Sequence, residues 1–264
     1  MTAAALRRAC LGAAGIVAVF GAAQLAMWAD RVNPAVFPLP STVLSSTVDM
    51  VSNSAFWASV AATLGIWVEA MAISVAIAVP LGLLLGSLPW AEQAVRPVIE
   101  FLRPIPSVVL IPLVLLIVQD NAKTQVVVIV FAAVWPILIN TVYGLSEVDP
   151  LAKQTLRTFG FGPVAVAWRV SLPSAAPFIG TGVRIAASVA FVVAVAAELI
   201  GAGMSGIGSY LTQVATSGTE GLTPILAVAA WSGALGLVIN GVFVGAERRV
   251  FRWHHMLAAQ GSGA

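Results

Sequence analysis

Long apolar runs, separated by short polar segments, dominate the chain. A helix that crosses a membrane needs about 20 mostly apolar residues, and six stretches meet that requirement. They are residues 9–29, 56–88, 98–118, 124–146, 175–199 and 221–246. The first run follows two arginines, as a signal peptide would, but its length and the five further runs favour a retained helix. The pattern predicts one all-α integral membrane domain, residues 1–264, with about six transmembrane helices.

The third run is irregular, because Pro104, Pro106 and Pro112 interrupt it. Two connecting segments are also more than simple turns. In residues 30–55, Ser41 is placed to cap a short helix lying on the membrane surface. Residues 200–220 are rich in glycine, which predicts a broken or re-entrant piece followed by a short helix.

Composition and charge support a membrane protein and exclude several other classes. Only 9% of the 264 residues are charged and 59% are hydrophobic, whereas a soluble domain carries about 25% charged residues. The net charge is +2 and no basic run is interleaved with aromatic residues, so no nucleic-acid partner is expected. A single cysteine, Cys10, rules out an intrachain disulfide.

The lysines and arginines predict how the helices are oriented. With the N-terminus in the cytoplasm, ten basic residues fall in cytoplasmic segments and two, Arg31 and Lys123, fall outside. We therefore expect a multi-pass protein of the bacterial inner membrane with both termini in the cytoplasm. Residues 147–174 then form a cytoplasmic loop, and residues 247–264 form a cytoplasmic tail.

The 147–174 loop has the signals of two short helices. Asp149 can cap the first, and Pro150 suits its first position. Gly160 is placed to end it, and a second helix can start at Pro163 and end at Pro173. The elbow between them carries one aromatic residue on each side of Gly160, namely Phe159 and Phe161. The loop could be a connector lying on lipid headgroups or a docking surface for a cytoplasmic partner.

The loop resembles the "EAA" loop of ABC importer permeases. Pro173 follows Gly160 by thirteen residues, and "VSLP" (170–173) fits the end of that signature. The stretches "FPLPSTV" (37–43), "LRPIPSVVLIPLVLL" (102–116) and "GVRIAASVAFVVAVAAELIGAGMSGIGSYL" (182–211) resemble the branch that imports sulfonates, taurine and nitrate. Where the family has Glu-Ala-Ala, this chain has Gln154, Thr155 and Leu156, so the acidic residue is missing.

The resemblance implies the architecture of a type I importer permease with cytoplasmic coupling helices. Its expected partners are cytoplasmic ABC ATPase subunits, a second permease subunit (identical or different), an extracytoplasmic substrate-binding protein and membrane lipid. The solute would be small and anionic, although relatives that import thiamine precursors keep another substrate class open. The residues implied in coupling to the ATPase are Gln154, Arg157, Phe159, Gly160, Phe161 and Pro173.

The sequence contains no motif by which this chain itself would bind a nucleotide or a metal. The two lysines, Lys123 and Lys153, each follow alanine, so no phosphate-binding G-x-x-x-x-G-K-[ST] loop is present. ATP and Mg²⁺ would therefore be bound by the partner ATPase, and no cofactor or metal is expected here. "GAGMSG" (201–206) matches G-x-G-x-x-G but follows an intramembrane helix. His254 and His255 lie in the basic tail and do not suffice for a metal site.

Three ionisable residues fall within or at the edge of the apolar runs: Glu69, Arg184 and Glu198. Charge at membrane depth is costly and is often functional. Arg184 is expected to form a structural or gating pair. Glu198 could line the mouth of the pathway, and Glu69 could face the pore or a partner subunit. For each, structural pairing or extension to the membrane surface is the alternative.

Two other classes of function remain as alternatives. A stand-alone secondary transporter or channel would also have charges within the membrane, but the two halves show no convincing repeat and the elbow would have no role. A membrane enzyme would need a nucleophile, acid or metal constellation, which the sequence does not show. The identity of the solute is not fixed by these residues.

Overall fold

The computed structural model describes residues 3–28, 38–201, 205–217 and 221–251. The remainder of the predicted tail, with His254 and His255, lies outside these ranges, as do residues 29–37, 202–204 and 218–220. The described part is helical and contains no strand, which confirms the all-α prediction. Within these residues, five helices are long and apolar enough to cross a membrane, or six if one bent pair counts as a single span. The longer helices are α1 Ala3–Trp28, α3 Ser54–Ser87, α4 Pro89–Leu102, α6 Asn121–Ser146, α9 Leu172–Leu199 and α11 Thr223–Val250; the shorter ones are α2 Pro40–Asp49, α5 Ile111–Val118, α7 Pro150–Thr158, α8 Pro163–Val166 and α10 Ile207–Ser217.

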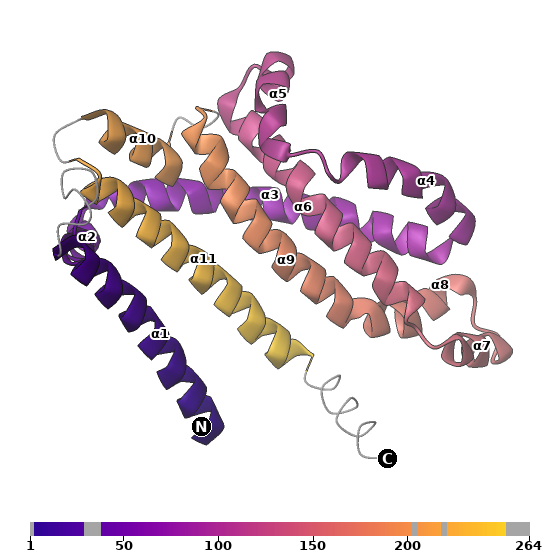
Figure 1. Ribbon diagram of the computed structural model, residues 1–264. Coiled ribbons are helices and arrows are strands. Elements are labelled where there is room, and N and C mark those ends of the chain that lie inside the picture. The colour runs from indigo at the N-terminus through magenta and orange to yellow at the C-terminus, as the bar shows by residue number, and fades with distance from the viewer. Residues whose placement is uncertain (1–2, 29–37, 202–204, 218–220, 252–264) are drawn as a thin grey trace.

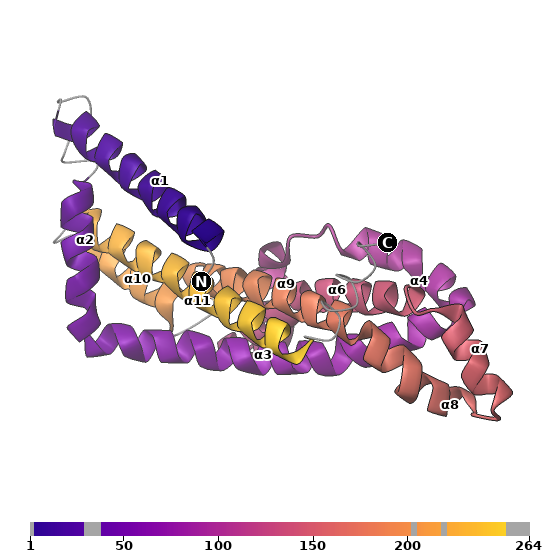
Figure 2. The same cartoon turned by 90° about the horizontal axis from the view of Figure 1, so that it is seen from below.

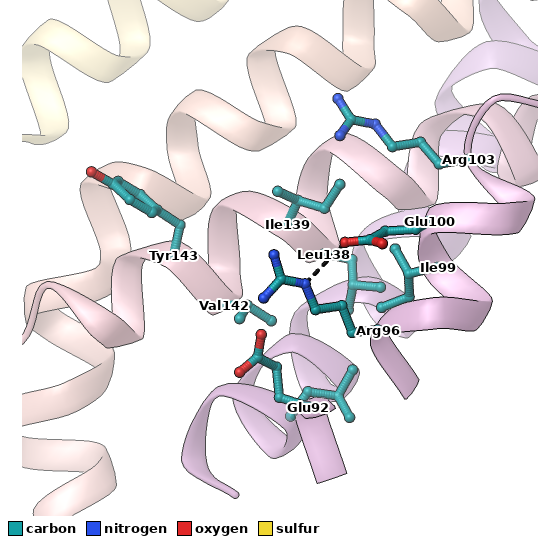
Figure 3. A pocket seen from close by; sticks show the side chains of 10 residues that line it. Glu92, Arg96, Ile99, Glu100, Arg103, Leu138, Ile139, Val142 and Tyr143 are labelled. Carbon is teal, nitrogen blue, oxygen red and sulfur yellow. Dashed lines mark hydrogen bonds and ion pairs between the residues drawn. The ribbon is translucent and has the colours of Figure 1, made fainter. Parts of the chain in front are cut away.

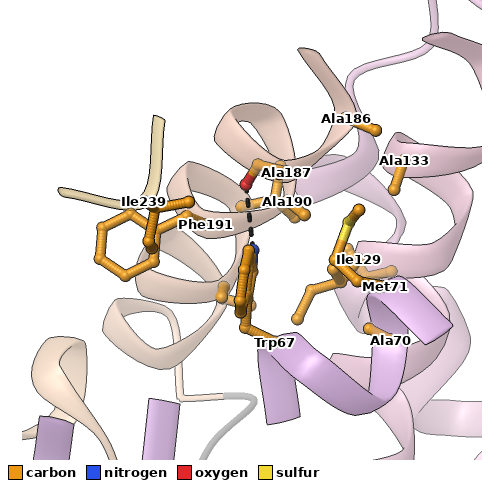
Figure 4. Close-up of a cluster of buried hydrophobic side chains, with 14 of the residues drawn as sticks. Trp67, Ala70, Met71, Ile129, Ala133, Ala186, Ala187, Ala190, Phe191 and Ile239 are labelled. Carbon is orange, nitrogen blue, oxygen red and sulfur yellow. Dashed lines mark hydrogen bonds between the residues drawn. The ribbon is translucent and has the colours of Figure 1, made fainter. Parts of the chain in front are cut away.

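The centre of the molecule is a bundle of α3, α6 and α9, with α11 packed against α9 (Figure 1). Small residues allow the close approach, as in many membrane helix pairs. A side chain at Gly82 would collide with Thr141, and one at Gly182 would collide with Asn140. Figure 4 shows the apolar packing around Trp67, whose indole Nε1 donates to the carbonyl oxygen of Ala187 at 3.0 Å. The bundle is therefore held by close packing and by hydrogen bonds such as that of Trp67.

The third predicted span is a broken element. Helix α4 begins at Pro89, well before residue 98, and meets the Ser107–Val118 segment at an angle of 82°. Pro104 and Pro106 lie in the break, where a proline cannot donate the hydrogen bond that would continue the helix. The irregularity predicted for residues 98–118 is a sharp bend between two helices, and the element begins earlier than predicted, at Pro89.

The two ends of the bundle carry different short helices. Figure 2 shows α2 and α10 at one end, here called the α10 end, and α7 and α8 at the other, here called the loop end. Helix α1 lies apart from the bundle in both views. The short helix expected in residues 30–55 is present as α2. Ser41 does not cap it, because the helix begins at Pro40, Leu39 takes the cap position and Ser41 lies inside the first turn. The fixed φ of proline suits that first position.

The helix after the elbow does not end at Pro173. Helical structure continues from Pro163 to Leu199, and no non-helical residue lies between α8 and α9. Residues Ala167–Ser171 are π-helical, and Pro173 lies in the first turn of α9. A π-helical turn changes the hydrogen-bond register, so the chain accommodates a proline nitrogen that cannot donate. The predicted stop is wrong, and the loop is joined directly to a transmembrane helix.

Candidate functional site

Helix α7 is fixed at its start and along its length. The Asp149 carboxylate Oδ1 accepts a hydrogen bond from the Leu151 amide at 2.8 Å, and Pro150 takes the first position, which confirms both predictions. The Lys153 ammonium donates to the carbonyl oxygen of Leu145 at 3.2 Å. This contact ties α7 to the last turn of α6.

The elbow after α7 depends on a glycine in the left-handed region. Gly160 has φ +81°. Its amide donates to the Arg157 carbonyl at 3.0 Å, and the Phe161 amide donates to the Leu156 carbonyl at 3.1 Å. These two bonds form the Schellman pattern that ends many helices. A Cβ atom at Gly160 would meet no atom within 4 Å, so the constraint is conformational and does not come from crowding.

The elbow presents aromatic side chains at the surface. Phe159 is 77% exposed and Phe161 is 37% exposed. The Arg169 guanidinium lies 4.7 Å from the centre of the Phe161 ring, which fixes that ring by a cation–π contact. The structure places all six coupling candidates on the exposed surface of the loop end: Gln154, Arg157, Phe159, Gly160, Phe161 and Pro173.

Arg184 is paired within the chain. Its Nε lies 3.1 Å from the Glu247 carboxylate Oε2, so the pair joins α9 to α11. The other carboxylate oxygen accepts from the Thr181 hydroxyl at 2.6 Å. The sequence alone did not point to Glu247, because only tertiary packing brings the last helix beside α9.

Glu198 is buried, with 2% of its surface exposed. Its carboxylate accepts from the Thr63 hydroxyl at 2.9 Å, the Gln125 amide Nε2 at 2.9 Å and the Gly208 amide at 2.9 Å. The Thr63 hydroxyl oxygen also accepts from the Ile207 amide at 2.9 Å. We call Thr63, Gln125, Glu198 and Gly208 the carboxylate hub.

The carboxylate hub joins α3, α6, α9 and α10 at the α10 end. Two glycines allow α10 to approach Glu198 this closely, because a side chain at Gly206 or Gly208 would collide with Glu198. Glu198 is buried within this chain, and its place at the mouth of the pathway stays a prediction. Its carboxyl group accepts hydrogen bonds from three other helices, as a buried polar group requires.

Glu69 has the opposite environment. It lies within α3 on an exposed position, while Trp67 and Ala70 on either side of it are buried in the bundle. The Glu69 carboxylate therefore points away from the bundle, toward lipid or a neighbouring subunit.

A charged groove that the sequence reading missed lies between α4 and α6 (Figure 3). Its volume is about 350 Å³. Glu92, Arg96, Glu100 and Arg103 line it from α4, and the Arg96 Nε lies 2.9 Å from the Glu100 Oε1. The spacing of residues 92, 96 and 100 places them on one helix face. This spacing is the sequence signal that could have identified the groove. The apolar residues Leu138, Ile139 and Val142 of α6 face them.

The fold matches that of a known class of membrane transporter. A crystal structure of an amino acid ABC transporter with histidines aligns with a TM-score of 0.60 and 18% identity, over 77% of this chain and 98% of that one. Residues 78–252 match the family model of the binding-protein-dependent transport system inner membrane component. The chain belongs to this family.

Its relatives include permeases with different solutes in their names. A probable ABC transporter permease of Brucella melitensis is 30% identical over 83% of this chain and 87% of its own length. A bicarbonate transport system permease of Synechocystis is 29% identical over 70% of this chain and 65% of its own length. A nitrate import permease of Leptolyngbya laminosa is 29% identical over 62% of this chain and 58% of its own length.

Proposed function

We propose that the chain is the permease subunit of an ATP-driven importer that receives a small inorganic or organic anion from an external binding protein. The observation that carries this proposal is the elbow, where exposed aromatic residues flank a left-handed glycine at the loop end. An aromatic side chain in water favours a partner that covers it. Bicarbonate and nitrate in the names of relatives support an anionic solute, and a sulfonate would also fit. A thiamine precursor is the alternative substrate class.

The elbow would couple this chain to a separate ATPase, which binds ATP and Mg²⁺. Helix α8 runs directly into α9, with no flexible connection between them. A displacement of the elbow by the closing ATPases would therefore be transmitted along α9 as a rigid-body motion. The Arg184–Glu247 pair, which joins α9 to α11, would carry part of that motion to the last helix.

A second permease subunit would complete the pathway. Helix α5 exposes Leu113, Leu116 and Ile117, and Glu69 faces outward from α3. A charge in that position is more readily accommodated beside a pore or another subunit than in lipid. Gln154 lacks the charge of the family's acidic residue but retains hydrogen-bonding groups, and a second, different permease chain could supply that charge.

We propose that the loop end lies in the cytoplasm and the α10 end outside the inner membrane, with both termini cytoplasmic. We expect Ser174→Cys to be labelled by a membrane-impermeant thiol reagent only after cells are opened, and Ser52→Cys to be labelled in intact cells. Both variants need a Cys10→Ser background, since Cys10 is a free and exposed thiol. Labelling of the Ser174→Cys variant from outside intact cells would reverse the orientation.

Co-purification tests the function itself. The affinity-tagged chain, purified in mild detergent from its own host, should retain an ATPase that carries a phosphate-binding lysine loop. That complex should hydrolyse ATP faster when the binding protein is added. A stand-alone transporter or channel would purify without an ATPase, and such a result would replace the importer proposal.

A further inference from the structure

The charged groove between α4 and α6 has no role in the coupling described above. Figures 1 and 2 show α4 running back from the loop end beside the bundle. Leu138, which lines the groove, lies eight residues before the end of α6, about 12 Å along the helix axis. On α4, Arg103 follows Pro89 by fourteen residues, about 21 Å along the axis. The hydrocarbon core of a bilayer is about 30 Å thick, so the groove extends from the loop end into the depth of the membrane.

The charged and apolar faces of α4 are turned in opposite directions. Three charged residues of α4 line the groove: Glu92, Arg96 and Glu100. Val98 and Phe101 lie on the opposite face of the helix and are 54% and 74% exposed. Charged side chains at membrane depth face a water-filled cavity or one another, and not lipid. The Arg96–Glu100 pair is open to its surroundings, since the two side chains are 67% and 65% exposed, so the groove requires water beside it.

The deep end of the groove carries a positive charge that no described residue neutralises. Figure 3 shows Arg103 and Glu92 at opposite ends of the charged row, with the Arg96–Glu100 pair between them. Glu92 lies in the first turn of α4, where the helix dipole stabilises a carboxylate. Arg96 and Glu100 neutralise each other. Arg103 also lines the groove, and its guanidinium forms no ion pair with a described residue. The net charge at the deep end is therefore positive.

We propose that this groove is a wall of the inner half of the solute pathway and that Arg103 selects a small oxyanion there. The inference rests on the proposed function, since the anion is the solute on its way to the cytoplasm. A guanidinium donates two parallel hydrogen bonds to a pair of oxygens on one anionic group. Hydrogencarbonate, nitrate and a sulfonate all present such a pair. The facing wall is apolar, with Leu138, Ile139 and Val142, so the anion meets one free cation and is held weakly enough to leave.

A cysteine in the groove tests for water. The complex with its ATPase is purified and reconstituted into lipid nanodiscs with an Ile139→Cys, Cys10→Ser chain. The rates of labelling are measured with two methanethiosulfonate reagents of similar size, one anionic and one cationic. We expect both to react. Val98→Cys, on the apolar face of α4, should react with both at least about tenfold more slowly, because charged reagents do not enter lipid. Equal rates at the two positions, or no labelling at Ile139→Cys, would overturn the proposal.

Substitution of Arg103 tests the selectivity for anions. Arg103→Gln should lower the ratio of the anionic to the cationic labelling rate at Ile139→Cys about fivefold, the effect of removing one unit charge about 8 Å from two reagents of opposite charge in water. Arg103→Lys keeps the charge and should keep the ratio. Arg248→Gln removes an exposed charge in the last turn of α11, outside the groove, and should also keep it.

The outcomes separate this site from the proposed function. An unchanged ratio in Arg103→Gln would refute the role of Arg103. An equal fall in Arg248→Gln would refute it as well, because the overall charge of the loop end would then set the ratio. Retention of the ATPase by the same complexes, scored separately, shows whether the proposed function stands when this site falls.

Discussion

Gly160→Val is expected to abolish most coupling between ATP hydrolysis and transport while leaving the helices inserted. Gly160 has φ +81° and ends α7 through two backbone hydrogen bonds. A β-branched residue in this region costs about 1–3 kcal/mol, so the elbow would leave this conformation. Phe159 and Phe161 would then no longer be presented together. We expect uptake driven by the binding protein to fall at least about tenfold, the effect of losing about 1.4 kcal/mol at an interface.

Gly162→Val is the matched control. Gly162 lies two residues away with φ −69° and ψ 167°, an extended conformation that valine adopts readily. As at Gly160, an added Cβ would meet no atom within 4 Å. Uptake and ATPase retention should therefore stay near the wild-type values. If the two valine variants behave alike, the left-handed conformation at Gly160 is not what the coupling requires.

Glu198→Leu is expected to be strongly destabilising. The change leaves the Gly208 amide and the Gln125 Nε2 in a buried position without their main acceptor. Each buried polar group left unpaired costs about 1–3 kcal/mol. We expect a lower Tm of the purified chain and release of α10 from the bundle, which proteolysis between α9 and α11 would detect.

Glu69→Leu provides the comparison for Glu198→Leu. Both residues are carboxylates at membrane depth, but Glu69 is exposed on α3. Its removal leaves no buried donor unpaired, and an apolar side chain is better accommodated against lipid. The Tm should stay constant or rise, even if transport changes. A fall in Tm as large as that of Glu198→Leu would contradict the assignment of the hub as the stabilising site.

The sequence predicted well what depends on local signals. The apolar runs predicted the long helices α1, α3, α6, α9 and α11. Asp149, Pro150 and Gly160 predicted the bounds of α7, because caps and left-handed turns depend on neighbouring residues. Pro173 was misleading, since the π-helical turn before it accommodates the proline within a continuous helix.

The environment of intramembrane charges could not be predicted in the same way. Glu69 and Glu198 look alike in the sequence, yet one faces outward and the other accepts hydrogen bonds from three other helices. The donors to Glu198 are far from it along the chain, except for Gly208. Likewise, Glu247 becomes the partner of Arg184 only when α11 packs beside α9.

The central claim is that the elbow holds the ATPase, and the ratio of ATPase to permease after affinity purification tests it most directly. Burial of one aromatic side chain contributes about 1.5–3 kcal/mol. Phe159→Ala combined with Phe161→Ala should therefore reduce the retained ATPase to a small fraction of the wild-type ratio, with the permease still present in the membrane. Trp168→Ala, which removes a side chain 68% exposed beyond the elbow, serves as the control and should change the ratio less. A wild-type ratio in the double variant, with normal ATP-driven uptake, would contradict the account.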